Sequence, residues 1–92
     1  MRILSTPEAR SLIHEKGGLL FVWITNAAGR VRILRTSTEP PPDALEWKRV
    51  ETKGFLLFLH PRMSLPRELH IEARGAVRRR IEAFWNGCAY VI

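Results

Sequence analysis

The sequence contains a single cysteine, Cys88, so it has no internal disulfide, and a cysteine-ligated metal centre would lack ligands within one chain. The longest apolar run, Leu19–Ile24, has six residues, whereas a membrane-spanning helix needs about 20. Residues 1–8 lack the apolar centre of a signal peptide. We therefore expect an intracellular, cytoplasmic protein without a membrane segment, and the lone thiol agrees with a reducing compartment.

The length of the chain, 92 residues, is that of one domain, and we expect residues 1–92 to form a single domain. Apolar residues make up 46% of the chain and charged residues 26%, a composition typical of a globular protein and not of a disordered one. A core of this size leaves no room for a separate catalytic domain.

Basic residues exceed acidic residues by six, and the excess is concentrated in the second half of the chain. Residues 47–92 hold nine basic and four acidic side chains, whereas residues 1–46 hold six and five. A basic half attracts nucleic acid or other anions through counterion release. Twelve of the fifteen basic residues are arginine, a bias that a GC-rich genome imposes on any protein, so a purely compositional origin stays open.

A short helix is predicted near the N-terminus. Ser5 and Glu8 have the spacing of a capping box with Ser5 as N-cap, and Pro7 suits the first turn. The apolar residues that follow share one helical face: Ala9, Leu12 and Ile13. Gly17-Gly18 then predicts the end of the helix, because glycine tolerates the left-handed backbone that closes many helices.

Five segments have the apolar pattern of strands: Leu19–Ile24, Val31–Thr36, Glu46–Lys53, Phe55–Leu59 and Leu69–Arg74. The first and fourth are apolar at every position, which predicts strands covered on both faces. The second is a half-exposed return strand after a turn at Asn26–Gly29, and the third is an edge strand. In the fifth, three residues point inward: Leu69, Ile71 and Ala73. The prolines between Thr36 and Asp43 predict a surface loop.

The last part of the chain fits two structures. Residues 76–85 keep helical spacing at Val77, Ile81 and Phe84, whereas Asn86-Gly87 between strand-forming residues is a strong hairpin signal. We favour the hairpin. The predicted fold class is α+β, with a mostly antiparallel β-sheet of about 5–7 strands and one N-terminal helix packed on it.

The sequence carries no catalytic motif. It has no Gly-x-Ser-x-Gly elbow, no phosphate-binding glycine loop and no pair of carboxylates whose spacing indicates acid–base catalysis. His14, His60 and His70 lack the spacing of metal ligands on one helix, and we interpret them as surface or rim residues. A three-histidine site assembled by the fold stays an alternative. We predict a protein that is not an enzyme and has no cofactor.

One basic cluster is a candidate anion-binding or nucleic-acid-binding site: Arg74, Arg78, Arg79, Arg80 and Trp85. On a strand, Arg78 and Arg80 would share a face with Glu82, and Arg79 would lie opposite. Arginine planes beside an exposed tryptophan suit stacking on single-stranded bases. A merely solvated face is the alternative. Cys88 is a candidate reactive thiol, although its neighbours offer no activating base, and an inert, partly buried thiol is the alternative.

The order of elements resembles that of the A-type iron–sulfur carriers, the HesB-like family. The resemblance includes the early helix with Ser5–Ile13, the Gly17-Gly18 step into a strand and the glycine-containing turn after it. Asn86-Gly87-Cys88-Ala89 stands where these carriers have a Cys-Gly-Cys pair. The family binds its cluster with three cysteines, but here only Cys88 matches, Asn86 replaces another, and the turn at Asn26–Gly29 has none.

The resemblance therefore implies the family's fold with cluster binding lost, or with ligands shared across a dimer. Two thiolates in a symmetric pair are fewer than the four usual cluster ligands. The same order also resembles a group of small bacterial proteins, which implies no function.

Three hypotheses follow. The first is a non-catalytic binding or interaction module whose partner is an unknown protein or a second copy of the chain. The second is a basic nucleic-acid-binding protein, and the third is a degenerate or dimeric iron–sulfur carrier-like scaffold. Exposed strands near residues 46–53 or at the C-terminus could pair between subunits, which is why a homodimer is included.

Overall fold

A computed structural model describes residues 1–26 and 32–85 of the chain. Its elements are β1 (Arg2–Ser5), α1 (Pro7–Glu15), β2 (Leu19–Asn26), β3 (Arg32–Ser37), the 3₁₀ turn η1 (Ala44–Glu46), β4 (Lys48–Thr52), β5 (Phe55–Leu59), β6 (Glu68–Arg74) and β7 (Arg80–Phe84). The predicted hairpin at Asn86-Gly87, most of the predicted turn at Asn26–Gly29, and Cys88 lie outside the described residues.

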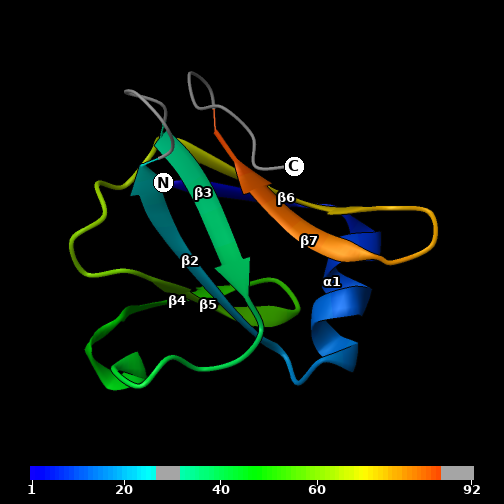
Figure 1. Cartoon of the computed structure of the whole chain (residues 1–92), viewed down its shortest axis with the longest axis horizontal. Coiled ribbons are helices and arrows are strands. Elements are labelled where there is room, and N and C mark those ends of the chain that lie inside the picture. The colour runs from blue at the N-terminus through cyan, green and yellow to red at the C-terminus, as the bar shows by residue number, and fades with distance from the viewer. Residues whose placement is uncertain (27–31, 86–92) are drawn as a thin grey trace.

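The seven described strands form two sheets, with the orders β1-β6-β7 and β3-β2-β5-β4 (Figure 1). Three neighbouring pairs are antiparallel, while β1–β6 and β2–β5 are parallel. The predicted α+β class with mostly antiparallel strands is confirmed, although the strands divide between two sheets. The edge strands β3 and β7 lie side by side, where the Thr36 hydroxyl donates to the Ile81 carbonyl at 2.7 Å.

The core contains residues from both sheets and from α1. Its fully buried side chains include Leu20 and Val22 on β2, which are in register with Leu57 and Leu59 on the parallel strand β5. The second sheet adds Leu69 and Ile71, and the helix adds Ala9 and Ile13. The predicted inward residues of α1 and β6 are thus confirmed, with Ala73 packed at the margin of the core.

The helix begins one residue later than the capping box predicts. Thr6 is the N-cap, and its Oγ1 accepts a hydrogen bond from the Ala9 N–H at 3.2 Å. Ser5 is the last residue of β1, in register with Ile71, so the prediction of Ser5 as the cap is wrong. Gly17 and Gly18, with φ of +119° and +84°, end the helix as predicted.

Three further points of the sequence predictions need correction. Strand β5 is not covered on both faces, because Leu56 and Phe58 are only partly buried. Residues 80–84 form a strand, so the helical alternative for this part of the chain is wrong. Arg78 lies in the turn before β7 and not on a strand, whereas Arg80 and Glu82 share a face as predicted. The predicted edge position of the 46–53 segment is confirmed by β4.

No helix within the described ranges is long and apolar enough to cross a membrane.

Candidate functional site

An aromatic cluster covers the face of the four-stranded sheet that points away from the core. Its members are Phe21, Trp23, Trp47, Phe58 and His60. Phe21 and Trp23 alternate with the core residues of β2, so they point to the opposite face of the sheet. Phe58 is in register with Phe21, and their rings stack with centroids 4.7 Å apart.

Trp47 closes this cluster from the connection that leads into β4. Its ring is nearly perpendicular to those of Phe21, Trp23 and His60, with centroids 5.7, 6.0 and 5.1 Å away. Phe21 is 1% exposed and Trp47 is 9% exposed, although both lie outside the main core cluster. Among the described residues, the buried Trp47 Nε1–H finds no hydrogen-bond partner. A buried indole N–H usually has such a partner.

The cluster borders a cavity of about 270 Å³, which we call the aromatic pocket. It is lined by Phe21, Trp23, Ser37, Glu39, Pro40, Pro41, Trp47 and His60. Pockets for drug-sized ligands have volumes of roughly 300–1,000 Å³, so this one suits a single side chain or a small molecule. No sequence motif indicates this site. Alternation along residues 19–24 places Phe21 and Trp23 on one face, but it shows neither that Phe58 joins them from another strand nor that Trp47 packs across them.

The three histidines lie on different elements. His14 is exposed on α1, and His60 directly follows β5, where its Nδ1 accepts a hydrogen bond from the Arg62 N–H at 3.1 Å. His70 on β6 stacks on Phe84 at 4.9 Å. Within residues 1–26 and 32–85, no three histidine, cysteine, aspartate or glutamate side chains are grouped so that they could hold a metal ion.

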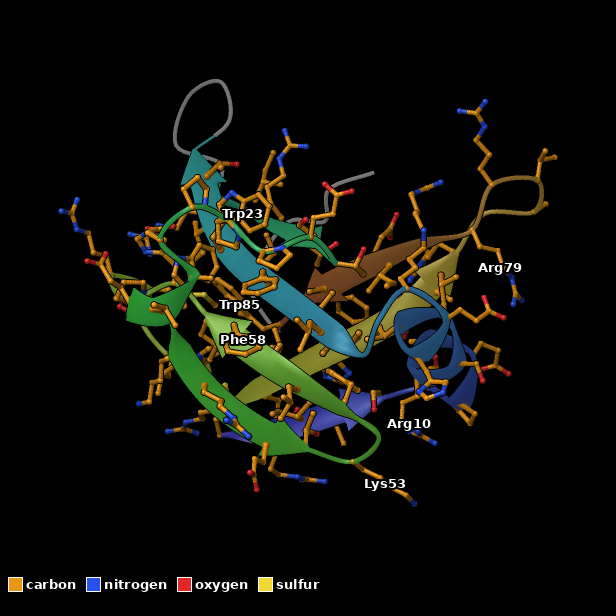
Figure 2. All side chains as sticks on the ribbon, turned by 90° about the horizontal axis from the view of Figure 1, so that it is seen from below. Arg10, Trp23, Lys53, Phe58, Arg79 and Trp85 are labelled. Carbon is orange, nitrogen blue, oxygen red and sulfur yellow. The ribbon has the colours of Figure 1, made fainter. Side chains whose placement is uncertain are left out.

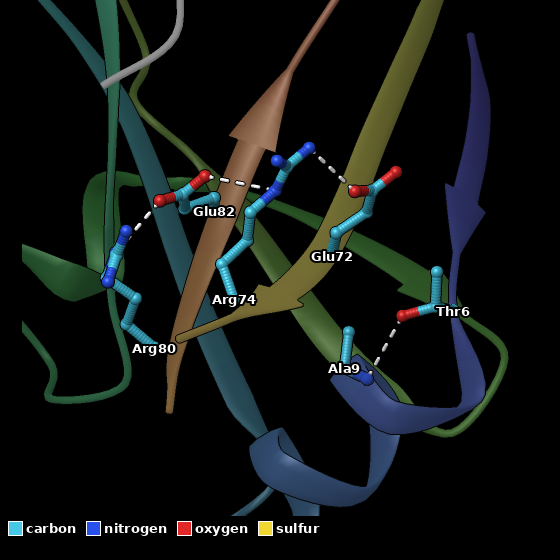
Figure 3. A network of polar contacts seen from close by, with 6 residues as sticks. All are labelled: Thr6, Ala9, Glu72, Arg74, Arg80 and Glu82. Carbon is cyan, nitrogen blue, oxygen red and sulfur yellow. Dashed lines mark hydrogen bonds and ion pairs between the residues drawn. The ribbon is translucent and has the colours of Figure 1, made fainter. Parts of the chain in front are cut away.

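The structure brings two of the predicted basic residues together, Arg74 and Arg80, around a buried carboxylate. The Arg80 Nε–H donates to Glu82 Oε1 at 2.8 Å, and Arg74 Nε lies 3.4 Å from Glu82 Oε2 (Figure 3). Arg74 also donates to Glu72 at 3.0 Å. Glu72 and Glu82 face each other in register, and the two guanidinium groups offset the repulsion between them. These two arginines therefore have internal partners.

The other predicted residues are not gathered with them. Arg78 and Arg79 are exposed in the turn that precedes β7, whereas Trp85 follows the far end of that strand (Figure 2). Trp85 packs against the core and borders a different cavity, together with Arg2 and Arg67. The structure thus places Trp85 beside basic residues that are distant from it in the sequence.

No protein-family model matches the sequence, and no curated protein matches it. Among solved structures, the fold is similar to the crystal structure of SufA from Escherichia coli, a protein involved in the biosynthesis of iron–sulfur clusters. The TM-score is 0.53 and the identity is 17%, and the match covers 96% of this chain and 87% of the SufA chain. At this identity the similarity shows the fold alone, and it supports the resemblance to A-type carriers at that level.

Proposed function

We propose that this protein is a non-catalytic binding module on a carrier-like fold, and that the aromatic pocket is its binding site. The observation that carries the proposal is a cluster of aromatic rings, separate from the main core and bordering a cavity, on the sheet face opposite that core. Concave sites lined mainly by apolar and aromatic side chains, with a few polar groups among them, are characteristic of ligand binding.

The similarity to SufA, a protein involved in iron–sulfur cluster biosynthesis, is in keeping with the fold of the carrier family that the sequence resembles, and it supports a binding role to that extent. The family that the sequence resembles holds its cluster with three cysteines, and this chain has one. A single chain therefore retains the scaffold without the ligand set. Binding then depends on other side chains of this chain. The aromatic pocket brings several aromatic side chains together around one cavity.

The test uses two small probes of nearly the same shape, choline and 3,3-dimethylbutan-1-ol, titrated into the protein while the indole N–H resonances are followed by NMR. Binding in the pocket is expected to shift the Trp23 and Trp47 resonances and to leave Trp85 unchanged. Trp23→Ala should abolish binding, while Trp85→Phe, which alters the tryptophan beside a different cavity, should not. If neither probe shifts Trp23 or Trp47 at millimolar concentration, the proposal fails.

The fold similarity also favours a second candidate, a dimeric carrier that uses Cys88 from each subunit. Anaerobic reconstitution with iron and sulfide should then load the wild type and leave Cys88→Ser without bound iron. Equal iron content in the two proteins would rule this candidate out, without affecting the aromatic pocket.

A further inference from the structure

We infer that the aromatic pocket takes a small organic cation that carries a quaternary ammonium group. This inference rests on the proposed function and specifies the ligand class of the same site. Three properties of the pocket carry it: its charge, its shape and its size.

The charged lining of the aromatic pocket differs from that of the other cavities. Four other cavities bordered by described residues are each lined by at least two lysine or arginine residues. The aromatic pocket has none, and its lining includes one acidic residue, Glu39, which also lines the cavity that Lys16, Arg35 and Arg80 border. In a chain with a net charge of +6, this is a local site where a cation meets no fixed positive charge in the wall.

The backbone at Glu39 is held in place by Ser37. The Ser37 hydroxyl accepts a hydrogen bond from the Glu39 N–H at 3.0 Å and donates to the Glu39 carbonyl at 3.1 Å. Because Ser37 ends β3, this turn fixes the position of the acidic residue relative to the sheet and to Trp23. The Glu39 side chain itself is exposed, so water screens it, and the rings must supply most of the attraction.

The rings of the pocket form a corner. Trp47 stands at 78° to Trp23 and at 75° to His60, and all three border the cavity. A corner of perpendicular rings surrounds a rounded group on more than one side, whereas a flat aromatic ligand would be matched by parallel rings. Tryptophan is also the side chain that attracts cations most strongly through its ring electrons.

Size limits the ligand to the end of a side chain or a small molecule, because the cavity volume is about 270 Å³. Arg35 is the cross-strand neighbour of Trp23 on this sheet face, and it lines a different cavity. Its charge opposes a bound cation from outside the pocket. Neutralising Glu39 and neutralising Arg35 should therefore change the affinity for a cation in opposite directions.

The experiment compares choline with 3,3-dimethylbutan-1-ol, in which an uncharged tert-butyl group replaces trimethylammonium. A cation site should bind choline about tenfold more tightly than the neutral analogue. Glu39→Gln should reduce this preference and Arg35→Gln should increase it. Glu51→Gln is the control, because Glu51 is an exposed carboxylate on β4, at the opposite edge of the same sheet from β3, where it pairs with Arg49 and does not line the pocket.

Each result bears on the inference. A choline preference that falls in Glu39→Gln and persists in Glu51→Gln supports it. Equal affinities, or tighter binding of the neutral analogue, would overturn the cation inference while the pocket remained a binding site. If neither probe binds, the proposed function and the inference both fail. Glu39 is exposed, so its substitution should leave the urea unfolding midpoint unchanged, and this measurement separates lost binding from lost folding.

Discussion

Replacing Glu82 with glutamine tests the polar network that joins β6 and β7. Glu82 is 8% exposed, which makes it the buried charged residue of the part of the chain that the structure describes. Its two carboxylate oxygens are held by Arg80 and Arg74. Glutamine keeps the shape of the side chain and one acceptor oxygen, but it removes the charge and places an N–H₂ donor where the second oxygen faces a guanidinium.

The expected loss of stability in Glu82→Gln depends on how exposed its two arginine partners are. Breaking an ion pair whose remaining partner stays buried costs about 3–5 kcal/mol. Here Arg74 and Arg80 are 45% and 50% exposed, so water solvates the released guanidinium groups. The expected loss is therefore smaller, about 1–2 kcal/mol, close to the value of charge-assisted hydrogen bonds at a partly exposed site.

Urea unfolding provides the assay, because a change in midpoint at constant slope reports the change in the free energy of unfolding. Glu72→Gln is the matched control: this carboxylate lies directly across from Glu82, is 34% exposed and pairs with Arg74 alone among the contacts described. Its loss should cost less than about 0.5 kcal/mol. Equal effects of the two substitutions, or a Glu82→Gln variant as stable as the wild type, would refute the reasoning.

Two further predictions concern the backbone. Thr6→Ala should destabilise the protein by about 1 kcal/mol through loss of the N-cap, whereas Ser5→Ala should have a much smaller effect, and the reverse order in urea unfolding would contradict the observed cap. Gly75→Ala should cost about 1–3 kcal/mol more than Gly17→Ala. Both glycines have positive φ, but a Cβ at Gly75 would overlap the Arg78 carbonyl oxygen while one at Gly17 meets open space. Equal thermal midpoints of the two variants would show that this overlap relaxes freely.

Local patterns account for the elements that were predicted correctly. The helical spacing of Ala9, Leu12 and Ile13 and the alternation of β6 are properties of neighbouring residues, and burial of an apolar face needs no knowledge of the partner. The same reasoning explains the misplaced cap. Ser5 and Thr6 are both competent N-caps, and the choice between them depends on whether Ser5 is needed for pairing with β6.

Pairings between distant segments account for what the patterns could not show. Strand β1 has four residues, too few to produce a periodic signal, and it exists because Ile3 and Leu4 align with β6 more than sixty positions away. The candidate site has the same origin. Trp47 reaches Trp23 because the connection between β3 and β4 runs from one edge of the four-stranded sheet to the other.

The arginine cluster shows what local sequence patterns and long-range strand pairing each determine. The sequence established that basic residues gather between Arg74 and Arg80 and that Glu82 alternates with Arg80 on a strand. The register of β6 against β7 determined that Arg74 joins Arg80 around Glu82 while Arg78 and Arg79 stay in the exposed turn. Residue type and spacing are local, and they set which faces are apolar or charged. Strand register is a long-range property, decided by the burial of whole faces, and it sets which of those charges and rings meet.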